Sequence, residues 1–169
     1  MAIKVHEIKI EWSGPFSLNE VIEKFLNGGR APDWGVEDYG LYQIYGRHIL
    51  HGRNTLLYIG MATEQTFSQR FKEHKTWLEN DQDEEDVRIY LARIYDPKKH
   101  SKKDNWTTWK NDVELAEKVL IYKYSPNYNS EGLTNEPDLS PYESIRLIHI
   151  GKRNRLREED NAPKDFLEW

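Results

Sequence analysis

The stretch of residues 40–74 constrains the fold of this chain more than any other part of the sequence. It contains two short apolar runs, residues 41–45 and residues 56–59, which are separated by a polar segment with two glycines. Runs of β-branched and aromatic residues bounded by glycine and polar residues are typical of paired strands. Thr66 and Gln69 follow at the spacing of a capping box, which marks the start of a helix. We therefore expect two strands followed by a helix.

The helix predicted over about residues 66–80 carries two polar residues that suit chemistry on a phosphate. Arg70 and His74 are four residues apart, so their side chains lie on the same side. On an ideal helical wheel, Arg70 lies beside the apolar stripe that includes His74, at the rim of a cleft. The alternative is an arginine whose stem packs along apolar surface while its charge stays in water.

A second helix, predicted over about residues 106–124, places one acidic residue among apolar ones. Glu117 lies between Val113 and Leu120 in the apolar stripe of the helical wheel. A carboxylate that faces a core is costly unless a cation or hydrogen bonds compensate its charge. A divalent metal ion, the guanidinium of Arg70 or a structural ion pair with another basic side chain would each do so.

Taken in order along the chain, these motifs resemble those of the GIY-YIG nuclease family. Residues 40–42 (Gly-Leu-Tyr) stand for the first triplet, with Leu in place of Ile, and residues 58–60 (Tyr-Ile-Gly) match the second triplet. Residues 70–74 match the Arg-x-x-x-His helix of the family. Glu117 is followed by Leu and Ile, and residues 126–129 contain the expected Pro and Asn.

The resemblance, which covers about residues 38–130, implies an α+β fold. Its central sheet would be small and three-stranded, mixed or antiparallel, with flanking helices. Residues 87–95 alternate in hydrophobicity and supply the third strand. We expect a nuclease core (38–130), an N-terminal extension (1–37) of a strand and a helix that packs on the core, and a C-terminal extension (131–169) with a basic segment.

The two extensions carry elements of their own. Residues 2–12 alternate in part and predict a strand that ends at the Ser-Gly-Pro break of residues 13–15. Ser17 and Glu20 form a second capping box, so a helix is predicted to begin there. Residues 144–150 predict a short strand in the C-terminal extension.

The resemblance further implies that the protein is a metal-dependent endonuclease acting on double-stranded or branched DNA. Hydrolysis would give a 5′-phosphate and a 3′-hydroxyl. Glu117 would hold one divalent cation, Mg²⁺ or alternatively Mn²⁺, since a hard cation suits a single carboxylate completed by water and phosphate oxygens. Arg70 would contact a non-bridging phosphate oxygen, to which its planar fork is better matched than a lysine.

The other candidate catalytic residues also follow from the resemblance. Tyr42 is the candidate general base, although a free tyrosine has a pKa of about 10 and would need help from a cation. Tyr58 would act at the phosphate or at the attacking water, and His74 would orient Tyr42 or assist proton transfer. Asn129 is either an ordinary turn residue or an amide that orients groups near the site.

The charge distribution bears on the partner. A net charge of −5 argues mildly against nucleic acid, but residues 98–110 and 145–157 are locally basic and could form one phosphate-facing surface. The segment 46–55 is basic as well. It carries His48 and His51, which fit either a pair of metal ligands or a solvated or DNA-facing loop.

Composition excludes several classes of protein. The chain contains no cysteine, so it has neither a disulfide framework nor a thiolate-bound zinc. No apolar run approaches the about 20 residues that span a bilayer, and the first residues lack the apolar stretch of a signal peptide. We therefore expect a cytoplasmic protein. The alternatives to a nuclease are a non-catalytic module that binds nucleic acid or protein on the same fold, and a structural protein that dimerises through its N-terminal part.

Overall fold

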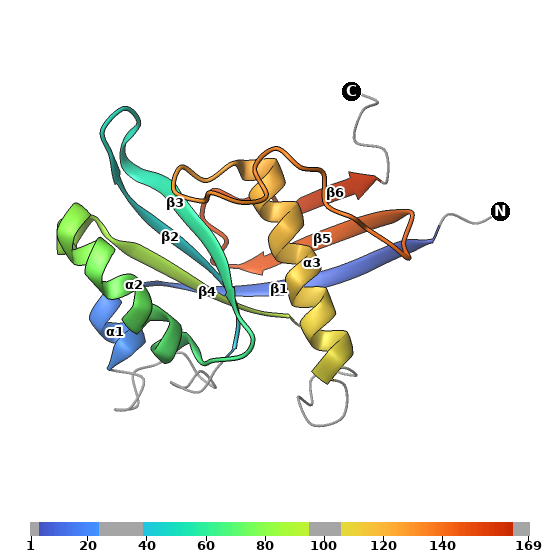
Figure 1. The fold of residues 1–169 in the computed structure, drawn as a ribbon, viewed down its shortest axis with the longest axis horizontal. Coiled ribbons are helices and arrows are strands. Elements are labelled where there is room, and N and C mark those ends of the chain that lie inside the picture. Colours follow the sequence, from blue (N-terminus) through green and yellow to red (C-terminus); the bar gives the residue numbers. More distant parts are fainter. Residues whose placement is uncertain (1–3, 24–38, 95–105, 164–169) are drawn as a thin grey trace.

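The computed structural model describes residues 4–23, 39–94 and 106–163. At its centre is one six-stranded sheet with the strand order β3–β2–β4–β1–β5–β6 (Figure 1). The strands are β1 (Val5–Phe16), β2 (Gly40–His48), β3 (Gly52–Ala62), β4 (Arg88–Ile94), β5 (Ser144–Gly151) and β6 (Glu159–Pro163). Neighbouring strands are antiparallel except for β1 and β5, which run parallel.

The prediction of an α+β fold is confirmed, but the prediction of a three-stranded sheet is wrong. The three expected strands are present as β3, β2 and β4, side by side. β1 pairs with β4 in antiparallel register, and β5 and β6 extend the same sheet further. The backbone groups on this edge of β4, which a three-stranded sheet would leave unpaired, are therefore hydrogen-bonded. β1 also continues through the predicted break at residues 13–15, with a register irregularity between Ser13 and Phe16. The predicted part boundaries at residues 37 and 130 stay predictions.

The β2–β3 hairpin is longer than the apolar runs indicated. The segment 46–55 was expected to be a polar loop, whereas β2 continues to His48 and β3 begins at Gly52, which is its partner in register. Gly52 and Asn54 have positive φ values of 78° and 55°, and residues in this conformation build bulged hairpin turns. Polar residues can therefore continue both strands, because the hairpin projects away from the core (Figure 1).

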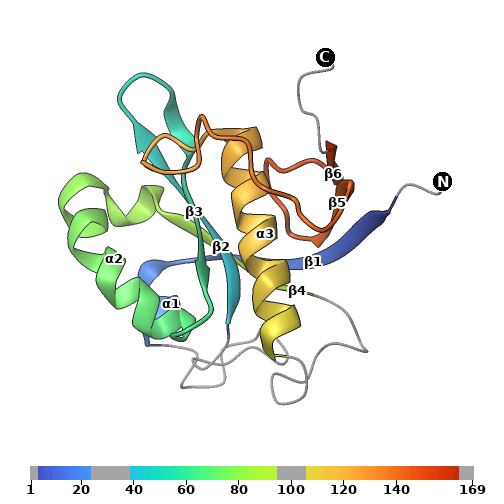
Figure 2. The ribbon, with the colours of Figure 1, turned by 45° about the vertical axis from the view of Figure 1, so that its right-hand side comes forward.

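Helices pack on both faces of the sheet. α1 (Leu18–Ile22) and α2 (Phe67–Asp81) share one apolar cluster, and α3 (Trp106–Tyr124) belongs to a second one (Figure 2). A short 3₁₀ helix, η2 (Glu84–Asp86), leads from α2 to β4. The capping boxes predicted at the start of α1 and of α2 are both present. None of the helices in the described parts of the chain combines the length and apolar character that a bilayer crossing requires.

The alternation of side chains along β2 explains the two layers. Tyr42 and Ile44 join the cluster beneath α1 and α2, whereas Leu41 and Tyr45 join the cluster beneath α3. Successive side chains of a strand point to opposite faces, so an apolar run without alternation is buried on both sides. This arrangement brings Tyr42 against α2 and leaves β3, at the end of the sheet, between the two helices.

Candidate active site

The hydroxyl group of Tyr42 is the centre of the candidate site. Tyr42 comes from β2 and is completely buried. Its oxygen lies 2.7 Å from Nε2 of His74, and Nε of Arg70 donates a hydrogen bond to the same oxygen over 3.1 Å. Both partners come from successive turns of α2, as the four-residue spacing of the sequence predicted. The structure therefore brings Tyr42, Arg70 and His74 together.

A second contact fixes the tautomer of His74. The indole nitrogen of Trp77 donates to Nδ1 of His74 over 2.9 Å, and an indole nitrogen can only donate. Burial, with the nearby charge of Arg70, lowers the pKa of His74 to about 4, so its ring is neutral at pH 7. A neutral ring whose Nδ1 accepts must carry its proton on Nε2. His74 therefore donates to the Tyr42 oxygen, which accepts two hydrogen bonds.

Two donors aimed at one phenol oxygen favour its ionised form, but the surroundings oppose ionisation. Burial raises the pKa of Tyr42 well above its ordinary value, and Arg70 acts in the opposite direction. Tyr58 and the carboxylate of Glu117 raise it further. The protein by itself therefore keeps Tyr42 protonated, while its hydrogen bonds match a phenolate. An additional positive charge near the site would move the balance toward ionisation.

Gly60 makes room for the two tyrosines. It lies opposite Tyr42 in the β2–β3 register. A Cβ at this position would collide with the hydroxyl and ring of Tyr42 and would lie 2.8 Å from Cε1 of Tyr58. Without it, the rings of Tyr42 and Tyr58 approach to a centroid distance of 6.0 Å, at 14° to each other. The glycine of the second triplet thus has a packing role that can be read from the register.

Arg70 links the two phenols. Besides its bond to Tyr42, it donates from Nη1 to Glu73 over 2.6 Å, and its charge lowers the pKa of Tyr58 against the effect of burial. Partial burial disfavours the charged form of Arg70, but the Tyr42 oxygen and Glu73 outweigh it and raise its pKa above the ordinary value. Its side chain is 32 % exposed, so the cation is partly accessible to solvent. The predicted position at the rim of a cleft stays a prediction.

Glu117 approaches the site from the other helix. Burial raises the pKa of its carboxyl group to about 7, against the opposing effects of the charges of Arg70 and Lys118 and of the Met61 backbone in β3. Glu117 and Tyr58 line one cavity of about 570 Å³. Glu117 therefore lies between α3 and the edge of the sheet, where the charge of Arg70 acts on its carboxylate.

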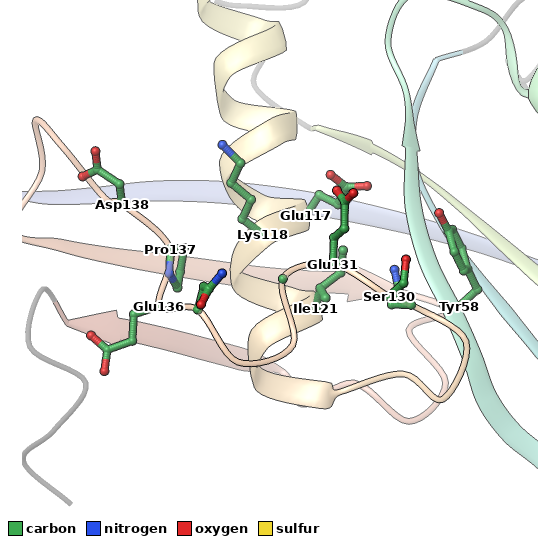
Figure 3. A pocket seen from close by; sticks show the side chains of 12 residues that line it. Tyr58, Glu117, Lys118, Ile121, Ser130, Glu131, Glu136, Pro137 and Asp138 are labelled. Carbon is green, nitrogen blue, oxygen red and sulfur yellow. The ribbon is translucent and has the colours of Figure 1, made fainter.

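The cavity contains an acid that sequence reasoning missed. Figure 3 shows the carboxylate of Glu131 next to that of Glu117, both to the same side of the Tyr58 hydroxyl. Burial raises the pKa of Tyr58; Arg70 opposes this shift, while Glu117 and Glu131 add to it. Glu131 lies in the loop after α3, where no periodicity singles out one acid. Among the described residues, no group of three or more His, Asp or Glu side chains surrounds a single point that could hold a metal ion.

Asn129 lines the same cavity but uses its amide on the backbone. The Ile59 N–H donates to Oδ1 over 3.0 Å, and Nδ2 donates to the Ile59 carbonyl over 2.9 Å. The Tyr128 N–H also donates to the Leu57 carbonyl over 2.8 Å. The segment 127–129 therefore covers part of the edge of β3, and Asn129 fixes the peptide between Tyr58 and Gly60. Its predicted catalytic role stays a prediction.

Only one of the two basic segments of the sequence lies entirely within the described residues. Of residues 98–110, those up to 105 lie outside the described residues, and Lys110 is ion-paired with Glu64. In the second segment, residues 145–157, Arg146 pairs with Glu159 over 2.6 Å. This pair lies on β5 and β6, at the edge of the sheet opposite to β3.

Comparison with known proteins does not assign the chain. No family model matches it, no curated protein matches it, and no solved structure matches it.

Proposed function

We propose that this protein is a metal-dependent DNA endonuclease that hydrolyses phosphodiester bonds to a 5′-phosphate and a 3′-hydroxyl. One observation carries the proposal. The Tyr42 oxygen accepts hydrogen bonds from His74 and Arg70, and a partly buried acid, Glu117, lies within electrostatic reach. A base, a permanent cation and an acidic ligand within electrostatic reach of one another are the groups that phosphodiester hydrolysis needs.

The oxygens of the cavity suit a hard divalent cation. Glu117 and Glu131 supply carboxylates on the same side of the Tyr58 hydroxyl (Figure 3), and Mg²⁺ is commonly held by one or two carboxylates with water and phosphate oxygens. Mn²⁺ has similar ligand preferences. When bound, the cation would act as a Lewis acid on the phosphate and the leaving oxygen, and its charge would favour ionisation of nearby phenols.

Tyr42 is the base of the proposed reaction. Its phenolate oxygen would take a proton from the attacking water, and the hydrogen bonds from Nε2 of His74 and Nε of Arg70 would stabilise the phenolate. His74 acts as a donor that stays neutral, because its pKa of about 4 keeps a second proton off the ring at pH 7. Tyr58 lines the cavity and would contact the water or the phosphate.

Arg70 is the phosphate ligand of the proposal. Its exposed partner Glu73 is 53 % accessible, and an ion pair at such a surface contributes about 0–1 kcal/mol. A phosphate oxygen can therefore replace Glu73 at little cost, while Arg70 keeps its bond to Tyr42. The guanidinium would then bridge the base and the charge that grows on the phosphate.

A second candidate is a non-catalytic binding module, for nucleic acid or for protein, on the same fold. It is favoured by the acids on the loop side of the cavity, Glu131, Glu136 and Asp138. Without a cation these side chains would repel a phosphate and attract a basic partner. Metal-dependent turnover would exclude this candidate.

The deciding experiment is incubation of supercoiled plasmid with the purified chain in Mg²⁺ or in EDTA. We expect nicking in Mg²⁺ only, and DNA ligase should reseal the nicks, because ligation requires a 5′-phosphate and a 3′-hydroxyl. Glu117→Gln should abolish nicking, and Arg70→Lys should reduce it about 100-fold through loss of the planar fork. Glu114→Gln, one turn earlier on α3, is the matched control and should cut normally. Nicking by a folded Glu117→Gln protein would refute the mechanism.

A further inference from the structure

The tip of the β2–β3 hairpin presents two bare aliphatic side chains. Ile49 is 95 % exposed and Leu50 is 81 % exposed. They occupy the turn between His48 and Gly52, which are paired across the hairpin. Single exposed apolar residues are common on protein surfaces, but here two adjacent ones stand at the end of a hydrogen-bonded β-ribbon that projects from the sheet (Figures 1 and 2).

The flanks of this tip are basic in a chain that is acidic overall. Residues 46–55 contain Arg47, Arg53, His48 and His51 and no acidic residue, against a net charge of −5 for the chain. Arg47 is exposed, and the Arg53 side chain is 74 % exposed, although it pairs with Asp86 over 3.2 Å. A polyanion that approaches the tip would therefore meet cations on both strands.

A row of rings connects the hairpin to the candidate active site. His48 stacks on His51 at a centroid distance of 4.8 Å, and its ring lies 6.2 Å from that of Tyr128. Tyr128 lies 5.6 Å from Trp77, whose indole donates to His74. Aromatic and imidazole faces of this kind stack on bases. Nucleic acid that followed this row from the tip toward Tyr42 would pass the acids Glu79, Asp81 and Asp83, which line one pocket with His48 and Tyr128.

The length of the hairpin sets the distance along this path. Ile49 is the seventh residue after Tyr42, and seven steps of about 3.3 Å correspond to at most about 23 Å. That length equals about seven base pairs at about 3.4 Å each. The tip can therefore reach the same DNA molecule whose phosphate occupies the candidate site.

We propose that Ile49 and Leu50 form a wedge that inserts into duplex DNA and unstacks one base step within about seven base pairs of the cut. This inference rests on the proposed function and adds how the site holds its substrate. Aliphatic wedges flanked by cations open base steps in proteins that bend DNA. A protein partner is disfavoured because a stable interface buries about 800 Å² on each side, which two side chains at the end of a ribbon do not supply.

The test uses duplexes that carry 2-aminopurine at successive positions up to ten base pairs from a preferred cut, with EDTA to prevent cleavage. The fluorescence of 2-aminopurine rises when its neighbours unstack. We expect a rise at one step with the unmodified chain and none with Ile49→Ser/Leu50→Ser. Ile150→Ser, at an equally aliphatic position that is 40 % exposed on β5, is the control and should keep the signal. Equal thermal stability of the variants checks folding.

Nicking assays separate this proposal from the proposed function. Suppose that the unmodified chain nicks plasmid, and that Ile49→Ser/Leu50→Ser nicks at the same rate and gives the same 2-aminopurine fluorescence as the unmodified chain. The wedge is then overturned while the nuclease stands. If the chain never nicks, but unstacks one step of a duplex labelled along its whole length and loses this effect in Ile49→Ser/Leu50→Ser, the nuclease is overturned. The insertion of Ile49 and Leu50 then stands, without its distance to a cut. Loss of binding to phosphatidylcholine–phosphatidylglycerol vesicles in the double variant, without an effect on DNA, would overturn the wedge in favour of a membrane contact.

Discussion

The indole nitrogen of Trp77 lies 2.9 Å from Nδ1 of His74, and this contact decides the direction of the hydrogen bond between His74 and Tyr42. With Nδ1 accepting, Nε2 must donate, so the Tyr42 oxygen is surrounded by donors. If the tautomer were reversed, Tyr42 would donate its proton to Nε2 and the oxygen would lose one stabilising contact. A tryptophan can therefore control the basicity of a tyrosine through the histidine that lies between them.

The first prediction concerns this tryptophan. Trp77→Phe keeps an aromatic ring but removes the donor to Nδ1, so both tautomers of His74 become accessible. We expect nicking to slow about tenfold. The reason is that losing one hydrogen bond to the phenolate costs about 1.4 kcal/mol, and this increase in activation free energy corresponds to a tenfold lower rate. Nitrogen chemical shifts of His74 measure the tautomer directly, and they should show Nδ1 partly protonated in the variant. An unchanged Nε2–H tautomer in Trp77→Phe would contradict the assignment.

The second prediction is a pH dependence of stability that arises from His74. Its pKa is about 4 in the folded protein because of burial and Arg70, against about 6.5 in an unfolded chain. Between these values the unfolded state binds the extra proton, so stability should fall as the pH is lowered from 6.5 to 4, by about 3 kcal/mol in all. Urea unfolding at several pH values measures the change.

The control for this pH dependence is His74→Gln, which has no titrating ring. Carboxylates elsewhere titrate in the same range, so the difference between the two proteins isolates His74. The stability curve of the variant should run flatter between pH 6.5 and 4 and should approach the parent curve on acidification. Parallel curves would show that His74 is already accessible to protons in the native state.

The third prediction is that Glu117 destabilises the metal-free protein. Burial raises its pKa to about 7, whereas an unfolded glutamate has a pKa of about 4.3. The folded state therefore prefers the protonated form, and ionisation costs stability as the pH rises through 7. Glu117→Gln should be more stable than the parent at pH 8 by about 2 kcal/mol, after a discount for partial exposure, and equal to it at pH 4.

If Glu117 holds the cation, added Mg²⁺ should make the parent protein more stable than Glu117→Gln. The parent should gain thermal stability with Mg²⁺ in proportion to occupancy, while Glu117→Gln should not respond. Glu114→Gln, which loses only a 3.8 Å ion pair with Lys110, should behave as the parent. An equal Mg²⁺ response in all three proteins would place the cation elsewhere.

The fourth prediction concerns the space above Gly60. A Cβ at this position would collide with Tyr42, so Gly60→Ala should displace the phenol and cost about 1–3 kcal/mol of stability, as overpacked cores do. It should also abolish nicking. In a Tyr42→Ala background the collision is removed, and the same change should cost much less. A double-mutant cycle in thermal unfolding measures this coupling, and additive effects would mean that the strand shifts instead of the ring.

The fifth prediction decides the role of Asn129. Both amide groups pair with the Ile59 peptide in a buried position, so Asn129→Ala should destabilise the fold by about 2–3 kcal/mol through two lost bonds and an uncovered peptide. At a temperature where the variant stays folded, nicking should fall less than tenfold. A loss of activity as complete as that of Glu117→Gln, with little loss of stability, would make Asn129 a catalytic group.

The sequence predicted the elements of the site better than the sheet that supports them. The capping box at Thr66 and the spacing of Arg70 and His74 are local features, so the helix and the shared side of these two residues followed from them. The inward orientation of Glu117 came from a helical wheel in the same way. These predictions held because a helix has a fixed period and its signals lie within one or two turns.

What the sequence did not reveal depends on contacts between distant segments. β6 (Glu159–Pro163) is a polar strand whose one partner among the described strands is β5, and its residues show no apolar alternation. Glu131 reaches the cavity because the loop after α3 folds back over it, and no period describes a loop. Trp77 was the exception that spacing could have found, since it lies three residues after His74 on the same helix.

The cover that residues 127–129 form on β3 has a consequence for the behaviour of the protein in solution. β3 is an 11-residue strand at the end of a sheet, and the unpaired backbone of such a strand is a template on which further copies of a chain can add and grow into fibrils. Asn129 and its neighbours hydrogen-bond part of that backbone. They belong to a short loop, which does not itself present a strand edge to a further copy. Loss of this cover should therefore show first as self-association of the folded protein, before any loss of its helices.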